Sequence, residues 1–186
     1  MATDPDDSRG DEVLIALINQ GEAEAFEALY GRHRDWVVSV AVRITGDADL
    51  ALDVMQETFL YVLKKFPGFR LTCQFRSFLY PAVRNLSIAA RQKAARLHSG
   101  TEVDLDTFEA KSEAGDSAAG RARLAAALAN LPEAQREVLL LRFVDGLSLA
   151  EIATALAVPS GTVKSRLHHA LAALRKDERT KEFFQE

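Results

Sequence analysis

The residue types best suited to chemistry gather in the last third of the chain, where a basic helical segment follows a tight turn. Residues 147–167 have the form of a helix-turn-helix, in which Ser148 and Glu151 are spaced as a capping box and residues 158–161 form the turn. Hydrogen-bonding and cationic side chains follow the turn, away from the apolar stripe of that helix: Thr162, Lys164, Ser165, Arg166, His168 and His169. Such side chains bind base edges and phosphates when a helix enters the major groove. We therefore predict that this helix binds DNA.

The apolar pattern of the same segment predicts how the hairpin packs. Ser160 or Thr162 is expected to cap the helix after the turn. The buried stripe of that helix is expected to consist of Val163, Leu167, Ala170, Leu171 and Leu174. The alternative is an amphipathic hairpin with no DNA role, which leaves the agreement of cap, turn and basic outer face unexplained.

A second basic surface is predicted between residues 60 and 96, which hold eight basic and no acidic residues. The cations alternate with aromatic residues, among them Phe66, Phe69 and Phe78. Cations follow a phosphate backbone, and exposed aromatic rings stack on unpaired bases at about 1–3 kcal/mol per base. We expect Phe66 and Phe78 to lie mostly in the core, so the exposed loop 69–74 is the better candidate for receiving a displaced base.

Asp53, Gln56 and Glu57 share one helix face because they are spaced by three and four residues. Two carboxylates at this spacing resemble a catalytic pair, but no histidine or second acidic cluster lies near them in the sequence. We therefore interpret the face as a docking surface. The sequence shows no nucleotide-binding loop, no nucleophile with its base and no metal-ligand spacing, so we expect no catalytic residue, no metal and no cofactor.

The helices that must position these residues follow from apolar spacing. Helical periodicity runs from Asp11 to about residue 45, from about 48 to 66, from about 75 to 97, and from about 121 to 176. Pro67 ends the second stretch, and Pro81 lies in the third, either near its first turn or at a bend. Strand-like alternation is missing, so the predicted fold class is all-α. The apolar side of the second stretch is expected to be formed by Leu52, Met55, Phe59, Val62 and Leu63.

Charge divides the chain into two small helical domains joined by an acidic flexible linker. The first domain is predicted to cover residues 11–96, the linker 97–120, the second domain 121–176, and a charged tail 177–186. The linker holds six acidic residues and one basic residue, whereas the second domain holds eight basic and four acidic residues. Two basic blocks separated by an acidic connector indicate two surfaces for polyanions.

Composition favours a reducing compartment. Cys73 is the single cysteine and cannot form an internal disulfide. No uncharged apolar run exceeds six residues, and the first ten residues lack the apolar stretch of a secretory signal. We therefore expect a cytoplasmic protein without membrane insertion.

In order and spacing, these motifs resemble a bacterial RNA polymerase sigma factor of the extracytoplasmic-function (ECF) type, in the sigma-70 family. Such factors consist of only the second and fourth conserved sigma regions, and the resemblance covers residues 11–96 and 121–176. Residues 53–59 (DVMQETF) resemble the core-binding helix, and residues 75–85 (FRSFLYPAVRN) the segment that opens DNA at the minus-ten element. Residues 131–139 (LPEAQREVL), with the helix-turn-helix, resemble the region that reads the minus-thirty-five element.

The resemblance implies a transcription initiation factor that binds core RNA polymerase, at its β′ clamp helices and β flap, and directs it to promoter DNA. It assigns core binding to Asp53, Gln56 and Glu57, and upstream DNA to the six residues of the helix after the turn. Contacts with single-stranded minus-ten DNA are assigned to Arg70, Arg76, Phe78, Arg84, Asn85 and Arg91. An anti-sigma factor is a further partner that the resemblance admits.

The chain departs from the family pattern at several places, of which three bear on the helices described below. Phe78 stands where tryptophan is usual, Pro81 interrupts a usually continuous helix, and Ala157 replaces a frequent turn glycine. The alternative function is a stand-alone helix-turn-helix transcriptional regulator with a helical sensor domain, which would not require the docking motif or the basic aromatic stretch. A helical adaptor without a DNA role does not explain the two basic blocks. Binding to core polymerase distinguishes these classes.

Overall fold

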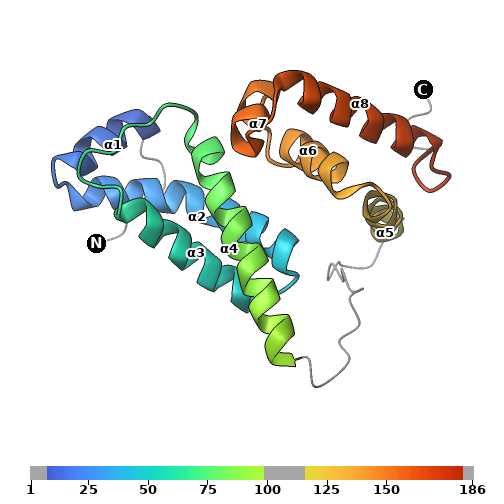
Figure 1. Cartoon of the computed structure of the whole chain (residues 1–186), viewed down its shortest axis with the longest axis horizontal. Helices are drawn as coiled ribbons and strands as arrows, with labels where there is room; N and C mark the ends of the chain where they lie inside the picture. Colours follow the sequence, from blue (N-terminus) through green and yellow to red (C-terminus); the bar gives the residue numbers. More distant parts are fainter. Residues whose placement is uncertain (1–7, 99–115, 182–186) are drawn as a thin grey trace. The chain divides into compact units, whose positions relative to one another are not determined.

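The computed structural model describes residues 8–98 and 116–181. Within these ranges the regular elements are eight α-helices and no strand, so the predicted all-α class is confirmed (Figure 1). The chain divides into two units, residues 1–105 and residues 106–186, each with its own set of packed helices. None of the helices in the described ranges combines the length and apolar character needed to cross a membrane.

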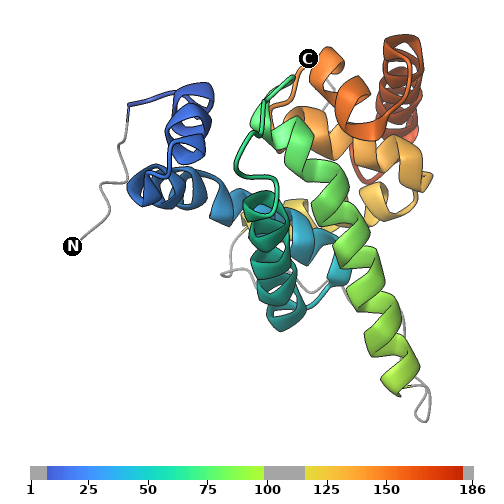
Figure 2. The ribbon, with the colours of Figure 1, turned by 60° about the vertical axis from the view of Figure 1, so that its left-hand side comes forward.

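The first unit is built around α2, which packs against the three other helices of the unit. Its helices are α1 (Asp11–Asn19), α2 (Ala23–Thr45), α3 (Ala48–Leu63) and α4 (Phe75–His98). In Figure 1, α4 crosses α2 and α3, and Figure 2 shows its C-terminal turns extending beyond them. Fully buried apolar side chains, each stabilising the unit by about 1.5–3 kcal/mol relative to exposure, form the core: Leu14, Leu29, Val37, Val40, Val54, Val62, Phe75, Leu79 and Val83.

Two consecutive residues turn the chain from α2 into α3. Gly46 has a φ of 73° and ends α2 in the left-handed conformation, which glycine adopts without a Cβ clash. Asp47 then caps α3, because its carboxylate accepts hydrogen bonds from the backbone N–H groups of Asp49 (2.8 Å) and Leu50 (2.9 Å).

Asp11 fastens α1 to α2. Its carboxylate accepts a hydrogen bond from Arg32 Nη1 at 2.6 Å and lies 2.9 Å from Nε2 of His33. The His33 side chain is buried, and its ring centroid lies 4.9 Å from that of Phe75 at the start of α4. Burial opposes ionisation of Asp11, but the hydrogen bonds and charges of His33 and Arg32 outweigh it and hold the pKa of Asp11 below its ordinary value.

Pro81 lies inside α4, because it is the seventh residue of a helix that continues to His98. Proline has no backbone N–H, so the carbonyl of Ser77 receives no helical hydrogen bond from it. Of the two placements left open by the sequence, a position near the first turn agrees with the structure, because Pro81 lies just after that turn. The stretch expected to be helical forms one helix with the proline in its second turn.

The second unit consists of α5 (Asp116–Ala129), α6 (Glu133–Phe143), α7 (Leu149–Leu156) and α8 (Ser160–Lys176). Helix α8 packs against both α6 and α7. One apolar cluster joins α5, α6 and α8, and its buried members are Ala127, Leu131, Leu139, Ala170 and Leu174. The stripe predicted for the last helix is confirmed, since its members are buried or half-buried.

The helices reach further into the expected linker than its boundaries allowed. Helix α4 continues to His98 and α5 begins at Asp116, so both ends of the expected linker 97–120 are helical. The start of α5 carries alanines, which have the highest helix propensity, behind an aspartate that suits a helix N-terminus. Residues 99–115, the rest of the expected linker, lie outside the described residues.

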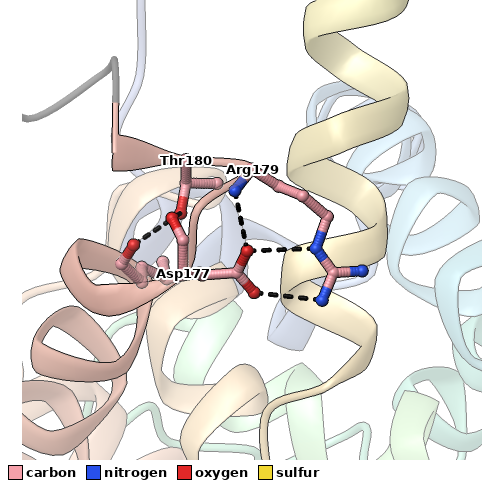
Figure 3. A network of polar contacts seen from close by, with 4 residues as sticks. Asp177, Arg179 and Thr180 are labelled. Carbon is pink, nitrogen blue, oxygen red and sulfur yellow. Dashed lines mark hydrogen bonds and ion pairs between the residues drawn. The ribbon is translucent and has the colours of Figure 1, made fainter.

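The residues directly after α8 form an ordered turn, in which Figure 3 shows Asp177, Arg179 and Thr180. Oδ1 of Asp177 accepts hydrogen bonds from the backbone N–H and from Nε of Arg179, at 2.9 and 3.0 Å. Thr180 is fully buried, and its hydroxyl donates to the carbonyl of Leu174 in α8. The expected charged tail 177–186 therefore begins as a folded cap of α8, and residues 182–186 lie outside the described residues.

Candidate functional site

The face expected to dock lies on the solvent side of α3. The side chains of Asp53, Gln56 and Glu57 are all exposed, whereas Val54 and Phe59 on the other side of the helix are buried. Three of the expected site residues are thus brought together on one accessible surface. Two carboxylates and an amide there can accept hydrogen bonds from a basic partner.

Two leucines extend this face along α3, Leu52 with 46% and Leu60 with 54% of its surface exposed. Each lies four residues from Gln56, so the three side chains are neighbours on the helix surface. Sequence reasoning missed Leu52, because apolar periodicity placed it on the buried side of the helix. The same prediction is wrong for Leu63, which is 41% exposed. The face therefore combines apolar area with acidic groups, a combination that suits a protein partner.

Four aromatic side chains form a cluster where α3 ends and α4 begins: Tyr61, Phe66, Phe69 and Phe78. The ring centroid of Phe69 lies 4.8 Å from that of Phe78 and 5.5 Å from that of Phe66. Tyr61 stacks on Phe78 with centroids 6.2 Å apart, and the ammonium group of Lys65 lies 4.6 Å from the centroid of Tyr61. The three phenylalanines are half-buried and Tyr61 is 38% exposed, so the cluster lies at the surface of the unit.

The loop expected to receive a displaced base joins this cluster. Phe69, at its start, packs in the cluster, while Arg70, Thr72 and Gln74 are exposed. The loop is held by a residue that sequence reasoning missed, Asn19 at the end of α1. The Asn19 side chain donates to the carbonyl of Phe69 at 2.8 Å and accepts from the backbone N–H groups of residues 68 and 69 at 2.6 and 3.1 Å. No local signal could have revealed this contact, since about fifty residues separate its partners.

The remaining residues expected to contact the opened strand all lie on α4. Asn85 is exposed and Arg84 is half-buried on α4. The guanidinium group of Arg76 lies over the Trp36 ring, 5.5 Å from its centroid, and Nη1 of Arg91 donates to the carbonyl of Ile44 in the last turn of α2 at 3.1 Å. Arg76 and Arg91 therefore already have partners within the unit.

The six residues expected to contact upstream DNA share helix α8. Lys164, Ser165, His168 and His169 are exposed, and Thr162 and Arg166 are half-buried. Oγ of Ser165 lies 3.4 Å from Nδ1 of His169, which orders these two groups on the helix surface. The arrangement offers hydrogen-bonding groups flanked by cations along one helix, as a major-groove reader requires.

The turn that presents α8 was predicted in part. The capping box is confirmed, because Oγ of Ser148 accepts from the backbone N–H of Glu151 at 3.2 Å and the Glu151 carboxylate accepts from the Ser148 N–H at 2.6 Å. Ala157 ends α7 in the left-handed conformation, with a φ of 52°. The expected side-chain cap of α8 is wrong: Pro159 occupies the capping position, and the helix begins one residue later with no side-chain cap.

The surfaces described so far carry groups that can bind a partner or a nucleic acid. Among the residues that the structure describes, no three His, Cys, Asp or Glu side chains gather as metal ligands. Cations, aromatic rings and amide groups on accessible surfaces instead suit phosphates, unpaired bases and base edges.

Two sequence families match the chain. Residues 29–97 match the family described as Sigma-70 region 2, and residues 121–174 match the family described as Sigma-70, region 4. The first match covers most of α2 with α3 and α4, and the second covers most of the second unit's helices.

Relatives similar to most of the chain carry sigma-factor names. The ECF RNA polymerase sigma factor SigL of Mycobacterium tuberculosis is 36% identical over 157 residues, which cover 83% of this chain and 89% of the relative. The ECF RNA polymerase sigma factor SigW of Bacillus subtilis is 29% identical over 177 residues, which cover 89% and 95%. The fold is similar to that of CnrH, solved in complex with the cytosolic domain of CnrY, with a TM-score of 0.64, 25% identity and coverage of 88% of this chain and 93% of that chain. The chain therefore belongs to the sigma-70 family of RNA polymerase sigma factors, and within it to the ECF type.

Proposed function

We propose that three exposed surfaces carry out this protein's work as a transcription initiation factor that directs core RNA polymerase to promoters. The α3 face binds the polymerase, the aromatic cluster with loop 69–74 binds the opened strand of the minus-ten element, and α8 reads the minus-thirty-five element. The observation that carries the proposal is the presence of all three surfaces on one chain, within segments that match sigma regions 2 and 4.

The α3 face suits a basic, partly apolar partner. Asp53 and Glu57 attract cations and orient the encounter, and the exposed Leu52 and Leu60 supply apolar area that is removed from water on binding. The family resemblance names the β′ clamp helices as the partner of this face and the β flap as the partner of the second unit.

The opened strand would meet the aromatic cluster and the exposed cations beside it. Tyr61 and Phe78 offer ring surface for stacking, and Arg70 is exposed for a phosphate contact. We assign a lesser part to Arg76 and Arg91, because each would first have to leave Trp36 or the Ile44 carbonyl.

On α8, the exposed Ser165, His168 and His169 would read base edges, and Lys164 and Arg166 would contact phosphates. Ser165→Ala or His169→Ala should therefore change base preference at particular upstream positions. Arg166→Ala should weaken binding across all sequences. A selection experiment on upstream sequences checks this assignment, and an unchanged consensus for both face variants would contradict it.

Binding to core polymerase is the decisive experiment. The double variant Asp53→Lys with Glu57→Lys should compete poorly with wild type for core enzyme and should lose run-off transcription, while far-ultraviolet circular dichroism stays unchanged. The control is Glu24→Lys with Glu27→Lys, which makes the same charge change at exposed positions of α2. Equal loss in both double variants would refute the assignment of the α3 face.

Promoter recognition should depend on the polymerase. Unstacking a base step costs a few kcal/mol, and the contacts that offset it require both units to engage the same DNA. We therefore propose that the free protein binds DNA weakly, in a salt-sensitive and nearly sequence-independent manner. A filter-binding titration against promoter and scrambled duplexes tests this, and tight selective binding without polymerase would favour the stand-alone regulator.

An anti-sigma factor is a second partner, and the cytoplasm, where the polymerase acts, is the proposed location. CnrH is solved with the cytosolic domain of CnrY, and we propose that this chain is bound by a partner of the same kind. The expected signature is competition, in which such a partner and core polymerase do not bind the wild-type protein at the same time.

A further inference from the structure

Asn19 links α1 to the loop between α3 and α4 through both ends of its amide group. Its Nδ2 donates to the carbonyl of Phe69 at 2.8 Å. Its Oδ1 accepts from the backbone N–H of Gly68 at 2.6 Å and from that of Phe69 at 3.1 Å. A single side chain thus fixes the position of two consecutive peptide groups in the loop.

These peptide groups lie directly beside the proposed strand-binding surface. Phe69 packs its ring against Phe66 and Phe78, at centroid distances of 5.5 and 4.8 Å. Gly68 has a φ of 96°, which favours glycine, so the chain turns sharply just before Phe69. The Asn19 amide therefore determines where the Phe69 ring and the exposed Arg70 that follows it are held.

Helix α1 is itself anchored to the rest of the unit. Asp11, at its first turn, is bonded to Arg32 and His33 of α2, and the His33 ring lies against Phe75 at the start of α4. Asn19 at the other end of the helix can therefore act as a brace, because the helix that carries it is held in place. Both residues of α1 precede residue 29, where the match to sigma region 2 begins.

We propose that Asn19 is a positioning residue for the capture of an unpaired base: by fixing the peptide groups of Gly68 and Phe69, it holds loop 69–74 in the conformation that receives the base beside the aromatic cluster. This inference rests on the proposed function, in which that loop binds the opened minus-ten strand. Asn19 acts through the backbone of the loop and the ring of Phe69. Its removal should cost the protein its response to the captured base, and leave polymerase binding and duplex binding intact.

The test is a cycle between the protein variant and the DNA, carried out with the full chain on core polymerase. The probes are fork-junction DNAs from a promoter that the wild-type holoenzyme selects in vitro. The single-stranded minus-ten segment is either complete or abasic at one position at a time. With wild type, the abasic change at the captured position should weaken binding about tenfold. With Asn19→Ala, that loss should shrink to about twofold. The ratio of the two losses, about fivefold, is the coupling that the cycle isolates.

Gln20→Ala is the matched control, because Gln20 is the next residue, is exposed and lies outside the brace. It should retain the wild-type loss at the abasic position. A brace that only stabilises the fold would lower affinity for complete and abasic DNA equally, so an equal decrease in Asn19→Ala would overturn the inference. An unchanged tenfold dependence in Asn19→Ala would overturn it as well.

A second variant decides the matter if Asn19→Ala fails to bind core polymerase. Asn19→Asp has the same shape and keeps an acceptor for the two N–H groups, but places a carboxylate oxygen against the Phe69 carbonyl. In this variant, we expect the abasic change to weaken DNA binding by less than half of the factor measured with wild type. An abasic effect as large as that of wild type would overturn the inference. If wild type itself shows no dependence on any minus-ten base, the proposed role of the loop fails, which is a result distinct from failure of Asn19 alone.

Discussion

Replacing Ala157 with glycine should stabilise the second unit. Ala157 has φ and ψ of 52° and 43°, and within the described ranges it is the one residue other than glycine with a positive φ. A side chain with a Cβ costs about 1–2 kcal/mol in this conformation. Glycine avoids that cost but loses more backbone freedom on folding, at about 0.5–1 kcal/mol. The net gain from Ala157→Gly is therefore about 0.5–1 kcal/mol, or about 2–8 °C in the unfolding midpoint of a unit of this size.

Calorimetry of the full chain can measure this gain against an internal reference. Trp36 is the single tryptophan and lies in the first unit, so its fluorescence reports unfolding of that unit and should not change. Ala153→Gly, inside α7, is the matched control. It should lower the free energy of unfolding of the second unit by about 1 kcal/mol, and therefore lower its midpoint. A midpoint that falls or stays constant in Ala157→Gly would refute the reasoning about the left-handed residue.

Three further predictions concern the contacts that hold each unit together. Asp11→Asn should destabilise the first unit by about 1 kcal/mol, read from Trp36 fluorescence during denaturant unfolding, because the bonds to Arg32 and His33 are weakened. The hydrogen bonds from Ser148 hold the pKa of Glu151 below its ordinary value. The ionised Glu151 therefore contributes fully to the stability of the second unit above the ordinary glutamate range, and this contribution is lost as pH falls through the lowered pKa. In Glu151→Gln, the free energy of unfolding of the second unit should therefore fall less steeply as pH is lowered into the acid range. An unchanged dependence on pH would contradict this. Thr180→Val should lower the free energy of unfolding of the second unit by about 1 kcal/mol, since the Leu174 carbonyl loses its buried donor. Calorimetry should show this as a lower unfolding midpoint.

Contacts between residues close in sequence could be predicted from the chain alone. The capping box of Ser148 and Glu151 needs only a three-residue spacing, and the grouping of Asp53, Gln56 and Glu57 needs only helical periodicity. Helical periodicity did not predict burial correctly where burial depends on which other helices pack against a face. Leu52 carries the right spacing for the core of α3 but faces solvent.

Contacts between distant segments could not be predicted, because no local pattern encodes them. Asn19 bonds to a loop about fifty residues away in the sequence. Arg91 bonds to the end of α2 over a similar separation in sequence. The sequence identified Arg91 correctly as a surface cation of the basic block. Its bond to the Ile44 carbonyl depends on how α4 crosses α2, which only the packed unit defines.

The turn after α8 determines where this protein can be extended or labelled. A fluorescent or affinity tag joined directly after Lys176 would replace Asp177 and Thr180, whose bonds close the last turn of α8 beside Leu174 of the apolar cluster. A tag joined after Lys181 leaves those bonds in place. Reporters for single-molecule or pull-down work on this sigma factor should therefore follow residue 181, so that the label does not loosen the helix for which we propose DNA binding.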